Sequence, residues 1–596
     1  MLKIKLNIHR RIIKNCYWQL NNKLGVILLP FYLVAMGFFP HEKLLAQEKL
    51  KDFDYWAGLC KLLPEEKKYA DAVAACDRAI DIKLDNPIVW TDRAEALLKL
   101  NKYTEALVSA ERAIRLKPEY ALAFVQRCQA LASLEKYEEA IPACDRSLRG
   151  DGNWGKSSSL MAWYYRGLSL IKLERYIDAI EAFNQALVIK PDYALALAYR
   201  CSALVGLGKY KEAIDACDIA LKSDGNWGVV TPAMAWFQRG LALQKLGRYE
   251  EAIASLDSAL AINPGDAIVW THHGVLLALV GKNAEALASY QFALKLIPTY
   301  SFALVNQCVS QSRLGMYKEA IVSCEGSIQG DGKWGDSSPA LAWTQRGNAL
   351  TGLARYEEAL GSHDRAFALK PNYAEAWNNR SVTLWVLGRY SDALLSNNKA
   401  TEINPKYTQA WFNKGRIFKS LKRYQDAVNA YDKALESSEI TAINKTLFAD
   451  IWANRSVVLW HLGRYAESLV SSDRAVNLNP DSFLGWYNRG VTLVSLTRYE
   501  EAITAYDRAI RINPNDTYLL TMKAIALMKL NRLEIALTNF DAALKLDPKN
   551  SLAQDNKDVV VKELDRRKKA EEERKKQEEL RKKQEEEQKS RGAVGK

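Results

Sequence analysis

The sequence is poor in histidine, in net charge outside its ends and in long apolar runs, and each shortage excludes a class of function. Its 596 residues include six scattered histidines and no metalloprotease, nucleophile-elbow or dinucleotide-binding motif. The net charge is +13, but residues 1–46 hold seven Lys/Arg against one Glu, and residues 548–596 hold sixteen Lys/Arg against twelve Asp/Glu. The residues between them carry only +3, whereas a nucleic-acid groove needs clustered cations. We therefore expect no enzyme, no metal or cofactor, and no nucleic-acid binding.

The one long apolar run lies near the N-terminus, at residues 24–39. It contains Pro30 and is shorter than the ~20 residues that a membrane-spanning helix needs. A basic stretch without acids precedes it, and Ala46 follows as a small residue suited to cleavage. This order predicts a secretory signal in residues 1–46, and the alternative is an uncleaved membrane anchor. Both place the rest of the chain in an extracytoplasmic compartment, the periplasm or an equivalent lumen. Only an uncleaved segment would contact the membrane.

One motif recurs along residues 47–550. A tyrosine returns mostly every 34 residues, a tryptophan stands thirteen residues before most of these tyrosines, and an alanine follows three residues after. The tyrosines are Tyr69, Tyr103, Tyr137, Tyr176, Tyr210, Tyr249, Tyr317, Tyr356, Tyr390, Tyr424, Tyr465 and Tyr499. The tryptophans are Trp56, Trp90, Trp163, Trp236, Trp270, Trp343, Trp377, Trp411, Trp452 and Trp486. The pattern predicts that each unit forms two amphipathic helices joined by a tight turn. Such units must stack on one another, because a single pair of helices cannot bury its own apolar face.

This pattern resembles the tetratricopeptide repeat (TPR), matched about fourteen times. The resemblance implies an all-α fold, a helical-hairpin solenoid (TPR superhelix) whose first helices line a concave surface. It also implies an exported, bacterial-type, non-enzymatic scaffold that binds a protein or peptide partner in the concave groove. The alternative is a cell-envelope scaffold that binds glycan or lipid.

Two tryptophans outside the repeat position mark a candidate binding surface. Trp385 and Trp460 each lie eight residues after a repeat tryptophan, late in the first helix of their units, where the resemblance implies a groove-lining face. Aromatic residues and arginine are the types that anchor interfaces. The alternative is that both tryptophans pack between repeats. The candidate partner-binding residues are Asn378, Val382, Trp385, Phe412, Arg416, Lys419, Val457 and Trp460.

A second periodic pattern predicts ion pairs within repeats. A basic residue stands three residues after most tryptophan positions, and an acid follows eighteen residues later, as in Arg346 and Asp364. Around a hairpin these two positions would face each other. Exposed pairs contribute only ~0–1 kcal/mol each, so we interpret them as structural.

Eight of the nine cysteines form four pairs, each 16 residues apart and each at the same two repeat positions. The ninth, Cys16, lies in the predicted signal. Export makes oxidation expected, and side chains at these positions could meet disulfide geometry. Buried reduced cysteines are the alternative, and a zinc site is disfavoured because the pairs lie in separate repeats. The predicted disulfides join Cys60 with Cys76, Cys128 with Cys144, Cys201 with Cys217, and Cys308 with Cys324.

Three insertions share the sequence D-G-x-W-G, at residues 151–155, 224–228 and 331–335. We expect each insertion to form a loop that ends a helix. In the neighbouring units another residue, such as Phe124, stands at the position of the repeat tryptophan, and we expect the loop tryptophan to fill the space that this leaves. Ligand or calcium binding is the alternative. Residues 150–157 also match a phosphate-binding pattern, but a helix rather than a strand precedes them, so we interpret the match as coincidence.

The C-terminal segment has a different composition. Residues 551–564 are expected to form a capping helix on the solenoid. Residues 565–596 repeat charged heptads with glutamate–lysine pairs four apart and almost no apolar seam. They predict a charged helical or disordered tail, a solvated single helix rather than a coiled coil.

Overall fold

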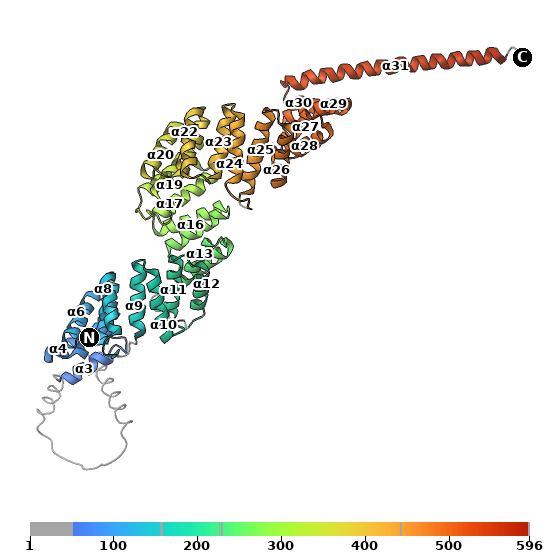
Figure 1. Cartoon of the computed structure of the whole chain (residues 1–596). Helices are drawn as coiled ribbons and strands as arrows, with labels where there is room; N and C mark the ends of the chain where they lie inside the picture. Colours follow the sequence, from blue (N-terminus) through green and yellow to red (C-terminus); the bar gives the residue numbers. More distant parts are fainter. Residues whose placement is uncertain are drawn as a thin grey trace, which may run out of the picture. The chain divides into compact units, whose positions relative to one another are not determined.

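The computed structural model describes residues 52–154, 159–223, 225, 227, 231–441 and 444–593. Every regular element in these residues is a helix, which confirms the predicted all-α fold (Figure 1). The predicted signal or anchor lies outside the described residues, and within them no helix is both long enough and apolar enough to span a bilayer. The helices are α3 (Phe53–Leu62), α4 (Tyr69–Ile82), α5 (Pro87–Lys99), α6 (Tyr103–Leu116), α7 (Ala121–Ser133), α8 (Tyr137–Leu148), α9 (Ser159–Lys172), α10 (Tyr176–Ile189), α11 (Ala194–Gly206), α12 (Tyr210–Leu221), α13 (Pro232–Lys245), α14 (Tyr249–Ile262), α15 (Ala267–Leu279), α16 (Asn283–Leu296), α17 (Ser301–Arg313), α18 (Tyr317–Ile328), α19 (Pro339–Gly352), α20 (Tyr356–Leu369), α21 (Ala374–Val386), α22 (Tyr390–Ile403), α23 (Thr408–Ser420), α24 (Tyr424–Glu436), α25 (Lys445–His461), α26 (Tyr465–Leu478), α27 (Phe483–Ser495), α28 (Tyr499–Ile512), α29 (Thr517–Lys529), α30 (Leu533–Leu546) and α31 (Ser551–Ala593).

Consecutive helices pair as hairpins, from α3 with α4 to α29 with α30. The turn between α13 and α14 shows how the sequence specifies them. Gly247 has φ of +74°, a left-handed conformation that glycine adopts without steric cost, and the N–H of Arg248 donates to the carbonyl of Leu243 (3.0 Å). Tyr249 then begins the second helix. The recurring tyrosine therefore marks the start of the second helix of each pair.

Two facing positions set how closely the helices of a hairpin approach. In one hairpin Gly274 lies against Tyr290, and a Cβ added at the glycine would be only 2.5 Å from the ring. The eight cysteines of the predicted pairs occupy the same two positions in four other hairpins.

The structure brings each of the four cysteine pairs together as predicted. The Cα atoms of a pair lie 4.8 to 5.4 Å apart, within the range that a disulfide requires. The pairs are Cys60 with Cys76 (Cα atoms 4.8 Å apart), Cys128 with Cys144 (5.2 Å), Cys201 with Cys217 (5.4 Å), and Cys308 with Cys324 (5.4 Å). The predicted geometry is therefore confirmed for all four, while Cys16 lies outside the described residues.

The helices form two compact units, α3–α12 and α13–α31, and the following description takes each by itself. In the first unit α7 contacts the first helices α5 and α9, and in the second unit α19 contacts α17 and α21, while α25 contacts α23 and α27. Among the described residues, no contact of comparable extent joins successive second helices. The first helices therefore form the inner layer of each unit, as the resemblance implies.

The periodic ion pairs join neighbouring repeats, so the prediction that they form within repeats is wrong. Asp364 pairs with Arg380 of the next repeat (3.0 Å) and not with Arg346, which donates instead to Ser362 of its own hairpin (2.7 Å). The sequence spacing could not identify the partner of each acid, because a basic residue of its own repeat precedes it and a basic residue of the next repeat follows it at a similar distance. The pairs between repeats include Arg93–Asp77, Arg127–Glu111, Arg166–Asp145, Arg346–Glu325, Arg380–Asp364, Arg455–Asp432, Arg489–Asp473, Lys523–Asp507 and Lys557–Asp541.

The first and third D-G-x-W-G loops cap the first helix of the hairpin that precedes them. In the third loop the Asp331 carboxylate accepts from the N–H of Ser301 (3.1 Å), at the start of α17, and from the N–H of Lys333 (2.9 Å). Asp151 does the same for Ala121 at the start of α7 (3.0 Å). These aspartates satisfy helix N–H groups that have no partner within the helix. In both loops the aspartate therefore caps a helix whose first residue lies thirty positions earlier in the sequence.

The first loop tryptophan packs at the start of α7, next to the repeat position that Phe124 occupies. Trp154 packs with a cluster at the start of α7 that includes Tyr120 and Leu122, because Asp151 ties the loop there. The guanidinium of Arg146 lies over the ring of Phe124, 5.6 Å from its centre. Residue Lys156 of the phosphate-binding pattern lies outside the described residues.

The last helix, α31, has two parts. Its first turns pack on α30, with Ala553 and Val560 buried and Leu564 partly buried in the same cluster. Beyond Asp565 the side chains are exposed, and glutamate–lysine pairs such as Glu571–Lys575 (2.9 Å) lie along the helix. Figure 1 shows this part as one uninterrupted helix that extends away from α29 and α30. The predicted charged tail is therefore helical as far as Ala593.

Candidate functional site

The candidate binding surface lies on three first helices of the second unit, α21, α23 and α25. Of the eight predicted residues, six are partly exposed and two are buried. The partly exposed residues are Val382, Trp385, Arg416, Lys419, Val457 and Trp460.

Trp385 and Arg416 form the centre of this surface. The guanidinium of Arg416 lies 4.2 Å from the centre of the Trp385 indole, and the indole N–H donates to Ser420 at the end of α23 (2.8 Å). Val382 lies beside them and lines the same shallow depression in the surface. The structure therefore brings three of the predicted residues together, and it also packs Trp385 against the next repeat.

Trp460 repeats this arrangement two repeats further along. Its indole N–H donates to Ser495 of α27 (2.8 Å), as Trp385 donates to Ser420. Its neighbour His461 stacks on Tyr424 with ring centres 4.7 Å apart. Both tryptophans thus have the inter-repeat packing that was the alternative interpretation, while part of each indole remains accessible.

Lys419 extends from α23 to α25, where its ammonium donates to Asn454 (2.8 Å). Burial lowers the pKa of Lys419, and the neighbouring charge of Arg416 lowers it further. Burial also lowers the pKa of Arg416, although the neighbouring Asp450 carboxylate acts in the opposite direction. Among the described residues, no carboxylate forms an ion pair with either cation. Two partly buried positive charges therefore lie side by side without a paired acid.

Asn378 and Phe412 were predicted to face the groove, and this is wrong. They are 2% and 7% exposed. Asn378 accepts a hydrogen bond from Asn413 of the next repeat (2.9 Å), and the Phe412 ring lies 6.0 Å from that of Tyr431. Their side chains are used in packing between helices, so neither can contact a partner directly.

Sequence reasoning missed Ser420, Ser495 and Asn454, which hold the groove side chains in place. The signal was present, because Ser420, Ser495 and Asn454 each stand 35 residues after the side chain that donates to them. Within the described residues, no group of three or more His, Cys, Asp or Glu side chains could hold a metal ion.

Comparisons with known proteins agree with the repeat pattern. Tetratricopeptide repeat models match residues 91–153, 161–193, 233–266, 344–408, 408–441, 449–482, 483–516 and 518–550, together more than half of the chain. No curated protein matches.

Several solved structures are similar to this chain. The APC/C hetero-tetramer Cut9–Hcn1 is 17% identical, with a TM-score of 0.41, over 87% of this chain and 98% of that chain. YrrB, a TPR protein with an unusual peptide-binding site, is 20% identical, with a TM-score of 0.29, over 33% of this chain and 97% of that chain. A tetratricopeptide repeat protein from Parabacteroides merdae is 16% identical, with a TM-score of 0.32, over 44% of this chain and 99% of that chain.

The stacked hairpins with an inner layer of first helices define a helical-hairpin solenoid. The family models then identify its repeats, and the chain belongs to the tetratricopeptide repeat family. Such repeats indicate a protein–protein interaction scaffold.

Proposed function

We propose that the protein is a non-enzymatic scaffold that binds a protein or peptide partner on the inner face of α21, α23 and α25. The observation that carries the proposal is the pair of cations, Arg416 and Lys419, which are partly buried without an ion pair beside partly exposed Trp385 and Trp460. Removing charges from water without a paired acid is costly, and a carboxylate supplied by a partner would offset that cost. The partner is therefore an extended segment with acidic residues next to apolar ones.

The two indoles would supply the apolar part of the contact. Tryptophan and arginine are enriched among residues that dominate binding energy, especially where they are already held rigid. Ser420 and Ser495 hold both indoles through their N–H groups, which reduces the entropy lost when a partner binds.

We also propose an extracytoplasmic location, with the body exported by the signal or held by the anchor predicted in residues 1–46. Four cysteine pairs at disulfide distance support it, because disulfides persist in oxidising compartments.

Site-specific photo-crosslinking tests the proposed groove. A photoreactive amino acid at Val382 or Val457 should crosslink the same partner from a cell-envelope extract. The matched controls are Leu395 and Val470, exposed apolar residues on the second helices of the same two repeats, 66% and 55% accessible. Equal crosslinking from the control positions, or none from the groove positions, would contradict the proposal.

A further inference from the structure

Two clefts away from the inner face share one construction. The α18 cleft lies between α18, α19 and α20 and has a volume of about 350 Å³. The α24 cleft lies between α24, α25 and α26 and has a volume of about 580 Å³. Both volumes fall within the range of small-molecule sites, about 300–1,000 Å³. Five lining positions correspond by repeat register: Glu325, Ile328, Gln329, Trp343 and Arg365 in the first, and Asp432, Leu435, Glu436, Trp452 and Arg474 in the second.

Both clefts occur where the linker between two hairpins is longer than usual. At an ordinary junction, α21 begins soon after α20 ends, and the Trp377 indole donates to the carbonyl of Pro371 (3.2 Å). Trp270, Trp411 and Trp486 donate to the equivalent proline carbonyls. Residues 329–338 separate α18 from α19, and residues 437–444 separate α24 from α25. At these two junctions a cleft lies beside the indole, and its lining includes Trp343 in one case and Trp452 in the other.

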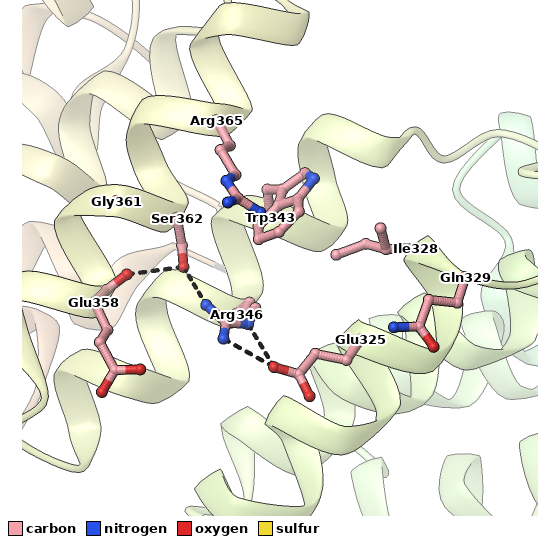
Figure 2. Close-up of a pocket in the computed structure, with 9 residues that line it drawn as sticks. All are labelled: Glu325, Ile328, Gln329, Trp343, Arg346, Glu358, Gly361, Ser362 and Arg365. Atoms are coloured by element: carbon pink, nitrogen blue, oxygen red, sulfur yellow. Dashed lines mark hydrogen bonds and ion pairs between the residues drawn. The ribbon is translucent and has the colours of Figure 1, made fainter.

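The indole of each cleft has lost its acceptor. In the part of the chain that the structure describes, neither Trp343 nor Trp452 donates its N–H to any group. An arginine from the second helix covers each indole, Arg365 at 4.6 Å and Arg474 at 4.7 Å, and neither guanidinium forms an ion pair with a described residue. Figure 2 shows Trp343 between Arg365 on one side and Ile328 and Gln329 on the other. Each cleft thus combines an aromatic surface with two hydrogen-bond donors, the indole N–H and the arginine guanidinium, that are available to a ligand.

Acceptors lie in the same clefts. Arg346 engages only one carboxylate oxygen of Glu325 (2.8 Å), which leaves the second oxygen and the amide of Gln329 beside the first indole. Glu436 and Asn477 line the second cleft, and Asp432 pairs with Arg455 (2.7 Å). A purely apolar ligand would leave these groups without partners, and a polyanion would meet a carboxylate in both clefts. The arrangement favours a ligand whose groups both donate and accept, which is the property of a hydroxyl.

We propose that the α18 and α24 clefts bind neutral saccharides. A saccharide presents apolar C–H faces that pack on an indole and hydroxyls that bond to mixed donors and acceptors at the edge of the same site. The chemistry is separate from that of the inner face, where two unpaired cations favour an acidic segment. The protein would then carry a partner on its inner face while its outer clefts hold it to a glycan.

Titration calorimetry on the full chain tests this proposal. The probe is the neutral oligosaccharide that gives the strongest signal when the protein is applied to an array of neutral glycans, trimmed to a disaccharide or trisaccharide too short to bridge two clefts. The wild type should bind two molecules per chain. Trp343→Ala and Trp452→Ala should each reduce the stoichiometry to one, and the double variant to zero.

Trp377→Ala is the matched control, because it removes a tryptophan of the same repeat position whose N–H is bonded and whose ring stacks on Phe367 (4.2 Å). It should leave the stoichiometry at two, which separates loss of a site from loss of repeat stability. Three results would overturn the proposal: no neutral glycan bound, a stoichiometry unchanged in the double variant, or an equal loss in Trp377→Ala. Binding of an acidic peptide in place of glycan, lost in the two cleft variants, would show a different occupant and would also overturn it.

Discussion

Replacing His363 by phenylalanine should make the protein more stable at mildly acidic pH and change its stability little at pH 7.5. His363 lies in α20 at the position where other hairpins place a tyrosine or phenylalanine against a glycine, such as Phe183 against Gly167. It is 0% exposed, and a Cβ added at Gly347 would be 2.5 Å from its ring. Its Nδ1 has no hydrogen-bond partner, and Nε2 lies 3.4 Å from the hydroxyl of Thr383.

The magnitude follows from the pKa of this ring. Burial, with a smaller contribution from the charge of Arg380, lowers the pKa of His363 from 6.5 to about 3. Below pH 6.5 the unfolded chain binds a proton that the folded chain does not, so the contribution of His363 is fully present above pH 6.5 and is lost as the pH falls toward 3. At pH 5.0 the loss is about 2 kcal/mol relative to pH 7.5.

The assay is denaturant unfolding of the wild type and His363→Phe at pH 7.5, 6.0 and 5.0. Both proteins share the same carboxylates, so the effect of these groups cancels in the difference between the two unfolding free energies. That difference should grow by about 2 kcal/mol from pH 7.5 to 5.0. His461→Phe is the control, because His461 is exposed and its variant should show a much smaller change. A difference that stays constant with pH would refute the assignment of a buried neutral histidine.

Three further predictions concern the scaffold. Mass mapping without reduction should find each of the four cysteine pairs linked in protein from its native compartment, and each disulfide should stabilise the fold by ~3 kcal/mol in the chain-entropy model. Free thiols at all eight positions would contradict both the pairing and the export. A double-mutant cycle on Asp364 and Arg380 should give a coupling of about 0.5 kcal/mol, as expected for a pair that is partly exposed, whereas a cycle on Asp364 and Arg346 should give none; coupling in the second cycle alone would restore the pairing within repeats. Asp331→Ala should cost about 1 kcal/mol of unfolding free energy through the lost cap on α17, and an unchanged denaturation midpoint would show that the loop does not cap.

The repeat could be predicted from the sequence because its signals are local. A glycine with positive φ, as at Gly247, and a tyrosine that begins the second helix act within a few residues, and their recurrence identifies the hairpin many times over. The cysteine pairing was predictable for the same reason, since two fixed positions face each other across one hairpin, as Cys60 faces Cys76.

Contacts between repeats were not predictable in the same way. Asp364 stands at similar distances along the chain from Arg346 and Arg380, so its partner depends on how neighbouring hairpins stack. The burial of Asn378 likewise follows from Asn413, which lies one repeat away. Each of the two clefts is lined by residues of three different helices beside a long linker, so no local sequence pattern predicts it.

The most direct test of the scaffold function is the affinity of the crosslinked partner, once captured from Val382, for variants of the inner face. Trp385→Ala with Trp460→Ala should weaken binding by about 2 kcal/mol or more while helicity is retained, as expected for anchor residues. The double control Leu395→Ala with Val470→Ala, on the second helices, should bind as the wild type does. Unchanged affinity in the tryptophan variant, or an equal loss in the control, would contradict the proposal that the partner occupies the inner face of α21, α23 and α25.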